Sequence, residues 1–564
     1  MVSGRPSLPT PIGSQPNTLT DVGISPAASD MLRHSGRASE AEVVLAHWYR
    51  GNLMSTLLQS AEPARPLIQT SRALSVLPMA AVLVASAGVS FGRPFRSNQN
   101  TYLLHAVGPS LSSLRDDWLL HTTDPHPIFT AVAGLASGRV GFAVESFVLM
   151  LAAFTGLYLV ASTLLRTASR TVRTAVPSLA VLLLTAGCYL LPHILVPAQS
   201  WAHPFRGFGG QFLMSIPSMF QASGCGTLML LGSGIAVWAT TSRLRRPLWV
   251  MAAGLAVSTC ALHPTYLAPL AVALLGFAVA DLASQRTIRR FGWYTGTGLA
   301  AVIVVVATNP VVRDSLTHDA GDPQRYLAFE RIPHHTLISQ WSVQDAFLAV
   351  VVLVGAGLTV RLTRAWWAGI VFTVCLIMTV ATALTVEITR NVTLAMMFPW
   401  RITVFLVPVA TLTVIVWLLR PIAERIGHVK ILFIAVACLM RVCLGVGTYL
   451  TLTAPDPTSE RAVRALRAAG PSGVGLIPPE LENSPKYPCR GIRGLESHPY
   501  ASADLAEWQR RITAVKLAET DGMFCRLGQR EKIAWVMLDP DRTAPACIAG
   551  WRRAGSDEVR IYIS

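Results

Sequence analysis

The chain has 564 residues, of which 52% are hydrophobic and only 14% are charged. A soluble domain usually carries about 25% charged residues, so the composition excludes a water-soluble globule of this size and indicates a membrane protein. Lys and Arg outnumber Asp and Glu by 47 to 31, a formal charge of +16. The positive residues recur singly and in threes between apolar runs, which argues against a nucleic-acid partner and is typical of cytoplasmic loops.

The N-terminal part divides into two segments. Residues 1–38 are rich in Pro, Gly, Ser and Thr and lack an apolar run suited to a signal peptide, which predicts a disordered cytoplasmic tail. Residues 39–72 begin with a run that predicts a helix with Ser39 as its cap. Trp48 and Tyr49 favour a helix at the membrane interface, but a short cytoplasmic helix packed on the first loops explains the same pattern.

Residues 73–453 predict an all-α, multi-pass membrane domain. A span needs about 20 apolar residues at a rise of 1.5 Å to cross roughly 30 Å of hydrocarbon. By this measure we count about eleven transmembrane helices. They start near Ala73, Gly141, Thr174, Met219, Leu248, Thr265, Tyr294, Gln344, Ala365, Met396 and Ile431.

The positive charges orient these spans. With the N-terminus inside, five successive inner loops carry Arg166, Arg170 and Arg173; Arg243, Arg245 and Arg246; Arg286, Arg289 and Arg290; Arg361 and Arg364; and Arg420, Arg425 and Lys430. All five obey the positive-inside rule of the bacterial inner or plasma membrane. The segments 92–126, 198–210 and 310–341 are then outer loops.

Because an odd number of predicted spans follows a cytoplasmic N-terminus, residues 454–564 are expected to lie outside the cell. They alternate predicted helices (459–469 and 503–518) with short strand-like runs (474–477, 533–538 and 559–563). We therefore expect a small α/β extracytoplasmic domain with its own core. Its three cysteines, which allow at most one internal disulfide, are Cys489, Cys525 and Cys547.

Histidines gather on the predicted outer face. Nine of thirteen lie in outer loops or at outer helix ends: His105, His121, His126, His193, His203, His263, His318, His334 and His335. Each one alone could simply end a helix beside a proline. Together they indicate a polar cavity, for which we single out His121, His126, His203 and His263.

The first outer loop holds the candidate catalytic carboxylates. Its run LRDDWLLHTTDPHPIF contains Asp116 and Asp117, followed by Asp124 near two of the histidines. A carboxylate that is partly desolvated near a cation suits a general base or a metal ligand. The alternative is a solvated acidic loop. The residues do not decide whether a divalent cation is the cofactor, so the metal stays open.

Positive side chains in the third outer segment can bind phosphate. Its run FERIPHH contains Arg331, His334 and His335, whose donors suit a phosphate or pyrophosphate. Arg401, in the run PWRI, lies near the outer end of a span, where an arginine is costly unless it pairs or faces a cavity. Walker A, GxSxG, HExxH and dinucleotide motifs are absent from the sequence, which argues against a cytosolic nucleotide-driven pump or a typical hydrolase.

Four runs carry a resemblance to a known family. They are NQNTYLLHA with LRDDWLLHTTDPHPIF, FERIPHH, HPTY at 263–266 and EWQRRI at 507–512. Together they resemble a bacterial multi-pass membrane protein family allied to the GT-C superfamily, the polyprenol-phosphate-dependent glycosyltransferases. The resemblance implies many spans, an acidic motif in the first extracytoplasmic loop, matched here by Asp116 and Asp117, and often a C-terminal outer domain.

These features lead to an expected function. We expect a membrane enzyme that transfers a sugar, with inversion, from a lipid-linked phosphate donor to an envelope acceptor on the extracytoplasmic face. Its partners are then the lipid-linked donor, the envelope acceptor and membrane lipids, with no nucleic acid. Two alternatives stay open: a transporter or lipid flippase, and a non-catalytic scaffold for envelope assembly.

Overall fold

The computed structural model describes most of the chain from Pro66 onward. The described residues are 66–90, 102–110, 118–135, 139–190, 222–240, 244–284, 289–318, 321–341, 343–364, 366–426, 429–453, 464–466, 468–471, 473–476, 499–517, 521–538, 543–556 and 559–564. The chain divides into two compact units, Met1–Thr70 and Ser71–Ser564. The predicted tail (1–38) and most of the segment 39–72 lie outside the described residues.

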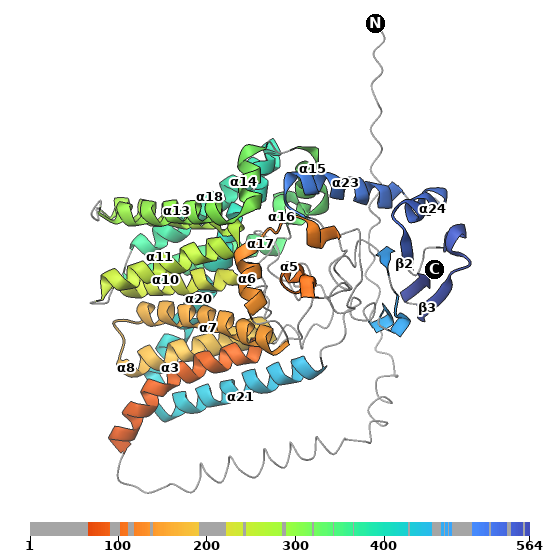
Figure 1. The fold of residues 1–564 in the computed structure, drawn as a ribbon. Helices are drawn as coiled ribbons and strands as arrows, with labels where there is room; N and C mark the ends of the chain where they lie inside the picture. Colours follow the sequence, from red (N-terminus) through yellow and green to blue (C-terminus); the bar gives the residue numbers. More distant parts are fainter. Residues whose placement is uncertain are drawn as a thin grey trace, which may run out of the picture. The chain divides into compact units, whose positions relative to one another are not determined.

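Long helices, seen side by side in Figure 1, form the membrane domain. They are α3 (Pro66–Ser90), α7 (Arg139–Leu164), α8 (Arg170–Leu184), α10 (Gly226–Ala239), α11 (Arg245–Leu262), α12 (Leu267–Ala283), α13 (Arg289–Thr308), α17 (Val343–Thr363), α18 (Trp366–Thr389), α20 (Thr403–Ile426) and α21 (Val429–Thr453). Each overlaps one predicted span. Seven helices of the described part are long and apolar enough to cross a membrane, so the chain is a multi-pass membrane protein, and the number eleven stays a prediction.

Small residues let the helices approach closely. A Cβ on Gly234 of α10 would overlap the backbone of Gly156 in α7, and a Cβ on Gly156 would overlap the backbone around Leu230. Without side chains at these positions the two helices touch backbone to backbone, as is common where a lipid-like environment offers no hydrophobic drive for association. The crossing fixes the two helices beside a core to which α3, α8, α12, α17, α18, α20 and α21 also contribute.

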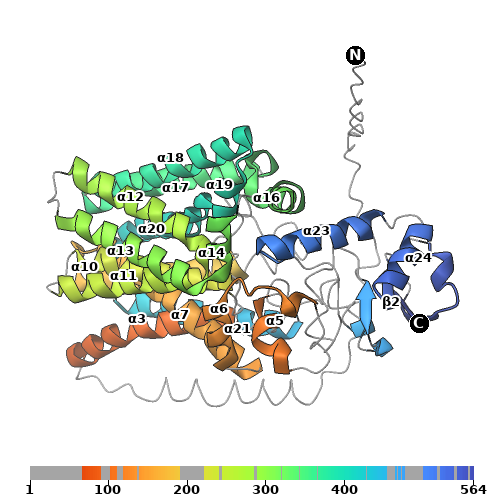
Figure 2. The ribbon, with the colours of Figure 1, turned by 45° about the horizontal axis from the view of Figure 1, so that its top comes forward.

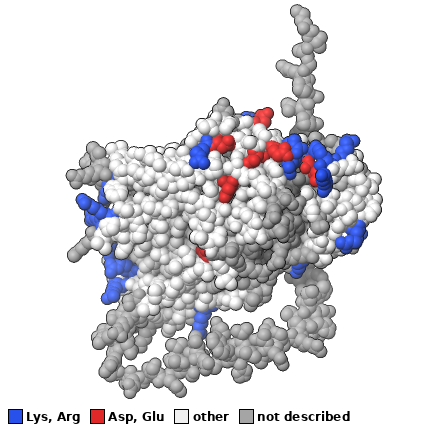
Figure 3. All heavy atoms as spheres, in the orientation of Figure 1, with Lys and Arg blue, Asp and Glu red and all other residues white. Residues whose placement is uncertain are grey.

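Most charged side chains of the described bundle lie near its ends; Arg441, midway along α21, is an exception. In Figure 3, Lys and Arg gather at one end, and the flank between the two ends is almost free of charge. Described arginines of the predicted inner loops lie where helices begin or end there, among them Arg166, Arg170, Arg245, Arg246, Arg290 and Arg364. We call this the arginine-rich end, and the other end the site end.

Short helices cover the site end. They are α5 (Leu104–Val107), η2 (Gly108–Ser110), η4 (Trp118–His121), α6 (Pro127–Leu135), η6 (Ala222–Cys225), η7 (Pro264–Tyr266), α14 (Pro310–Thr317), α15 (Asp322–Tyr326), η8 (Leu327–Arg331), α16 (Pro333–Thr336), η9 (Ile338–Gln340), α19 (Val392–Met397) and η10 (Pro399–Ile402), and a further short turn, η5 (Thr185–Leu190), continues α8. Asparagines begin two of them: the side chain of Asn309 accepts from Val312 N at 3.0 Å, and that of Asn391 accepts from Leu394 N at 2.8 Å. Such caps satisfy amide groups that have no partner within the helix.

The C-terminal domain contains a four-stranded sheet, as predicted in kind; Figure 2 labels its strand β2 and the helix α24 (Asp521–Arg530). Its strands are β1 (Val474–Leu476), β2 (Ile533–Leu538), β3 (Arg552–Ser556) and β4 (Val559–Ile563), in the order β1-β2-β4-β3. Only β1 and β2 are parallel. Alternate residues of β2 bury opposite faces: Val536 packs with Phe524 and Leu527, and Trp535 with Leu466 and Ile561.

The C-terminal domain has one helix that was predicted, and one helix and one strand that were not. The helix α23 (Ser502–Leu517) matches the expected one, whereas α24 (Asp521–Arg530) and β3 were not predicted. The sequence of β3, RRAGS, has no apolar alternation that would predict a strand. The strand β3 is an edge strand and pairs with β4 alone in this sheet, so it needs no apolar face for a second neighbouring strand.

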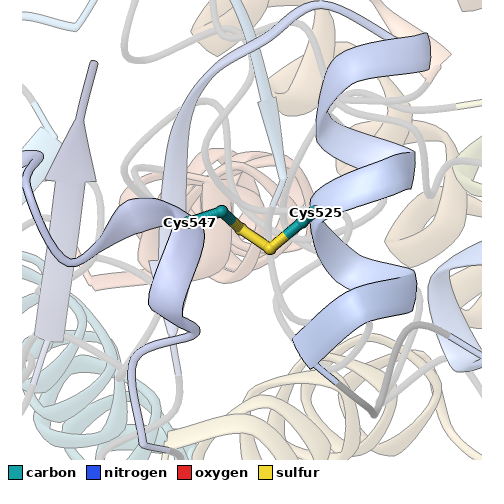
Figure 4. The surroundings of a disulfide bond; sticks show 2 residues. All are labelled: Cys525 and Cys547. Carbon is teal, nitrogen blue, oxygen red and sulfur yellow. A yellow bond between two sulfur atoms is a disulfide. The ribbon is translucent and has the colours of Figure 1, made fainter.

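One disulfide, the number that the three cysteines allow, joins α24 to the short helix η12 (Ala546–Ile548). Cys525 and Cys547 are bonded across a sequence separation of 22 (Figure 4). Cys489 lies outside the described residues. Because disulfides persist mainly in oxidising compartments, this bond supports the predicted extracytoplasmic position of the domain.

Candidate active site

Three segments far apart in sequence meet at the site end of the bundle. His126 precedes α6, His263 follows α11, and Arg401 lies in η10, just before α20. The rings of His126 and His263 lie 4.5 Å apart, and Tyr102 lies 5.2 Å and 6.1 Å from them. We call His126, His263, Arg401, Thr265 and Tyr102 the His–Arg cluster.

The loop before α6 fixes His126. Its backbone N–H donates to Asp124 Oδ1 at 2.8 Å, and its carbonyl accepts the amide of Thr130 in the first turn of α6 at 2.8 Å. Asn309 Nδ2 donates to the carbonyl of Pro125 at 2.8 Å, which joins this loop to the start of α14. Asp124 therefore orients the histidine backbone, and the loops around Pro125 and Asn309 come together here.

A hydrogen-bond relay connects Arg401 to His263. Arg401 Nη1 donates to Thr265 Oγ1 at 2.8 Å, and Thr265 Oγ1 lies 2.7 Å from His263 Nδ1. Because a guanidinium can only donate, the threonine oxygen accepts from Arg401, and its own proton is free to point at Nδ1. When the threonine donates to Nδ1, the neutral His263 ring carries its proton on Nε2.

Strained backbone holds Arg401 in place. Phe398 has φ 48° and ψ 52°, a left-handed conformation that costs a non-glycine residue roughly 1–2 kcal/mol. The turn sets its ring 4.2 Å from the guanidinium carbon of Arg401 and 6.4 Å from the ring of His335. Trp400 Nε1 then donates to the His335 carbonyl at 2.9 Å, so His335 and Arg401 adjoin the same aromatic ring.

The cluster is built around an uncompensated positive charge. Arg401 is 8% exposed, and none of the ion pairs among the described residues includes it. Three buried nitrogens of the cluster have no hydrogen-bond partner in the described part of the chain: Arg401 Nε, His263 Nε2 and His126 Nδ1. Buried polar atoms are rarely left unpaired, so these three atoms are available to a bound ligand.

Burial keeps both histidines neutral. It lowers the pKa of His126 to about 3 and that of His263 well below the usual value, and the positive charge of Arg401 acts in the same direction on both rings. A neutral ring leaves Arg401 as the charge of the cluster and lets His263 act as a hydrogen-bond donor.

The depressed histidine pKa values predict acid sensitivity. Below about pH 6.5 the histidines are protonated in the unfolded chain but stay neutral in the folded protein. The two neutral histidines therefore contribute their full stability to the fold above pH 6.5, and this contribution is lost as pH falls toward 3. Between pH 7.5 and 5.5 the free energy of unfolding should fall by about 1.4 kcal/mol per histidine. Melting temperatures of the purified protein, recorded across this pH range, measure the loss of stability. The melting temperature of His126→Gln should depend less on pH than that of the wild type, whereas the exposed control His121→Gln should behave like the wild type. An equal pH dependence of the melting temperature in the two variants would contradict the assignment of neutral, buried histidines.

The helix α23 closes the site from the C-terminal domain. Asp504 Oδ2 accepts from Thr123 N at 2.8 Å, and Ser502 N donates to Asp314 Oδ2 at 2.7 Å. Trp508 is fully buried against Leu327. Tyr500, just before α23, lies 6.3 Å from the ring of His126, so the C-terminal domain contributes a side chain to the site.

The EWQRRI run now has a structural role. Glu507 Oε1 accepts from Arg511 Nε at 2.6 Å, and the Arg511 guanidinium lies 4.5 Å from the ring centre of Trp118 in the first outer loop. The run therefore anchors α23 on the segment that follows the two candidate catalytic carboxylates.

The predicted site residues separate into groups. His126, His263 and Arg401 converge, Asp124 supports them, and His335 adjoins Phe398. Arg331 is half-buried in η8 and His121 is exposed at the end of η4. The residues outside the described part are Asp116, Asp117, His203 and the side chain of His334.

Tyrosines and a threonine were missed as site residues. Tyr102 and Thr265 lie within the runs that carry the family resemblance, so their position in those runs could have marked them as site residues. Tyr266 donates from its hydroxyl to the carbonyl of Ser223 at 2.6 Å, against Gly226, where a Cβ would overlap that hydroxyl. Tyr500 carried no local signal, because only the docking of α23 brings it to the site.

A metal site is not assembled from the described residues. No group of three or more His, Cys, Asp or Glu among them could hold a metal ion. Because Asp116 and Asp117 lie outside that part, a cation at the first outer loop stays a prediction.

Comparisons with known proteins give a general likeness. No family model and no curated protein matches the chain. A solved structure that it resembles is the oligosaccharyltransferase of Archaeoglobus fulgidus in complex with Zn and sulfate, with a TM-score of 0.40 and 11% identity over 82% of this chain and 68% of that one. We transfer no residue role from this likeness.

Proposed function

We propose that the protein is a GT-C-like membrane glycosyltransferase that uses a lipid-linked phosphate donor. One observation carries the proposal: Arg401 is buried, has no carboxylate partner among the described residues, and is linked through Thr265 to a neutral His263. Donors fixed before the ligand arrives stabilise the charge that develops on a leaving phosphate without reorganising.

The reaction divides between two parts of the site. As the acceptor oxygen bonds to the anomeric carbon, the bond from that carbon to the phosphate oxygen breaks, and negative charge grows on the phosphate. Arg401 and His263 Nε2–H face this charge, with His126 and His335 beside them. Asp116 or Asp117, the acidic motif of the family resemblance, takes the acceptor proton as the general base.

Burial favours transfer over binding alone. A low-dielectric environment strengthens the interaction of Arg401 with a phosphate, and Tyr500 adds an aromatic ring 6.3 Å from that of His126. A scaffold would gain nothing from a buried charge that costs stability until a ligand arrives.

Mass spectrometry of lipids and envelope glycans from a deletion strain tests the proposal. We expect a glycosylated polyprenyl phosphate to accumulate where a membrane-impermeant oxidant can reach its sugar, with loss of one envelope glycan. A flippase would leave the sugar shielded from the oxidant, and a scaffold would leave the lipid-linked pool unchanged. Either result would contradict transfer.

The proposed chemistry requires an extracytoplasmic C-terminal domain and a cytoplasmic N-terminus. The arginine-rich end of the bundle and the disulfide in the C-terminal domain support this orientation. A C-terminal alkaline phosphatase fusion should be active. Fluorescence from a C-terminal fusion to a protein that matures only in the cytoplasm would contradict the orientation, and with it the outer position of the His–Arg cluster.

A further inference from the structure

A cavity of about 640 Å³ opens inside the bundle toward the arginine-rich end. Residues of α7, α10, α11, α12, α13, α17, α18 and α20 line it, together with Ile402 of η10, which is adjacent to Arg401. Its volume is that of a site for a small organic ligand. None of its lining residues belongs to the His–Arg cluster.

The interior of this cavity is long and apolar. Both Leu270, near the start of α12, and Ser284, just past its end, line the wall, so it extends along about 21 Å of helix at a rise of 1.5 Å per residue. Met229, Phe372 and Phe405 form its inner surface. A hydrocarbon chain fits a space of this length and character.

The rim carries positive charge. The described lining residues include Arg166, Arg245, Arg290 and Arg364, and no carboxylate. Two of these arginines are held in place: Arg290 by the buried Asp281, at 3.3 Å, and Arg166 by a hydrogen bond to the carbonyl of Thr363, at 3.4 Å.

Tryptophans lie beside the arginines. Trp249, Trp293, Trp366 and Trp367 also line the cavity, and indole rings suit the level of lipid headgroups. The rim therefore combines phosphate-binding donors with side chains typical of the membrane interface.

We propose that this cavity binds one anionic phospholipid, with its phosphodiester among the rim arginines and an acyl chain along the apolar wall. A free phosphate would leave the apolar chamber unused, and a neutral lipid would leave the cationic rim unused. The predicted cytoplasmic leaflet, which borders this end, is the leaflet whose anionic lipids attract basic groups. The site uses residues different from those of the proposed reaction.

The chain offers a matched pair of variants for the test. Arg166→Gln with Arg245→Gln removes two rim arginines, whereas Arg170→Gln with Arg246→Gln removes two exposed arginines from the same end that do not line the cavity. Native mass spectrometry of the full chain in detergent would compare added phosphatidylglycerol with phosphatidylcholine. We expect phosphatidylglycerol to bind the wild type at least tenfold more tightly, the rim pair to lose this preference and the control pair to keep it.

A second variant tests the acyl chain separately from the charges. Ala273→Phe places a ring inside the cavity with all four arginines present, and it should lower phosphatidylglycerol binding while the protein still elutes as a single folded species. Equal losses in the rim and control pairs would show diffuse attraction and overturn the proposal. So would unchanged binding in Ala273→Phe, or displacement of the lipid by millimolar inorganic phosphate.

Discussion

Replacing Arg401 with glutamine should lower sugar transfer by about 100- to 1,000-fold, the usual loss when one preorganised donor to a developing anion is removed. The guanidinium is the charge of the cluster, and the relay through Thr265 that orients His263 begins at Arg401. Transfer of labelled sugar by membranes containing equal amounts of each protein measures the effect.

The same variant separates a functional arginine from a structural one. Because the charge is buried without a carboxylate partner in the described part of the chain, a neutral glutamine removes a desolvation penalty. The melting temperature of Arg401→Gln without donor should therefore stay close to that of the wild type. Arg390→Gln is the matched control: Arg390 is paired with Glu387 at 3.2 Å and lies over Phe329 rather than Phe398. Equal activity of the two variants would contradict a role for Arg401.

Asparagine at Asp117 or Asp116 should lower transfer by about 10²- to 10⁴-fold, the usual contribution of a general base. Asparagine nearly preserves the shape of the side chain but accepts no proton at this pH. We expect Asp117 to be the more sensitive position, since Asp116 is adjacent to Arg115 and is the better placed to pair with it. Complementation of a deletion strain, with protein amounts from immunoblots, measures the loss.

The double variant decides the role of the acidic motif. Full complementation by the protein with both asparagines would show that the carboxylates do no chemistry. A reduced protein level, rather than reduced activity, would indicate that they have a structural role, because breaking a buried ion pair destabilises the fold.

Apolar run length and charge made most of the fold predictable. Each predicted span overlaps a long helix, and the arginines that orient the spans lie at one end of the bundle. The predicted strands of the C-terminal domain exist because β2 and β4 are apolar runs covered on both faces. The edge strand β3 and the polar helix α24 lack that pattern, so composition could not reveal them.

The site was predictable in its residues but not in its grouping. We placed Arg401 with Arg331, His334 and His335 because all can bind phosphate. The structure brings it to His126 and His263, with His335 beside the same Phe398 ring, because the start of α6, the end of α11 and η10 meet at the same place in the bundle. Helix packing decides this, and a single sequence does not encode the neighbours of a span in any local pattern.

The central claim is that the His–Arg cluster binds the phosphate of a lipid-linked donor, and the stabilisation of the purified protein by polyprenyl phosphate tests it most directly. A ligand at about 100 times its dissociation constant stabilises a folded protein by about 2.7 kcal/mol. With phosphatidylglycerol held constant, we expect the melting temperature to rise for the wild type, for Arg390→Gln and for the rim pair Arg166→Gln with Arg245→Gln, and to stay unchanged for Arg401→Gln. A rise in Arg401→Gln equal to that of the wild type would contradict the claim.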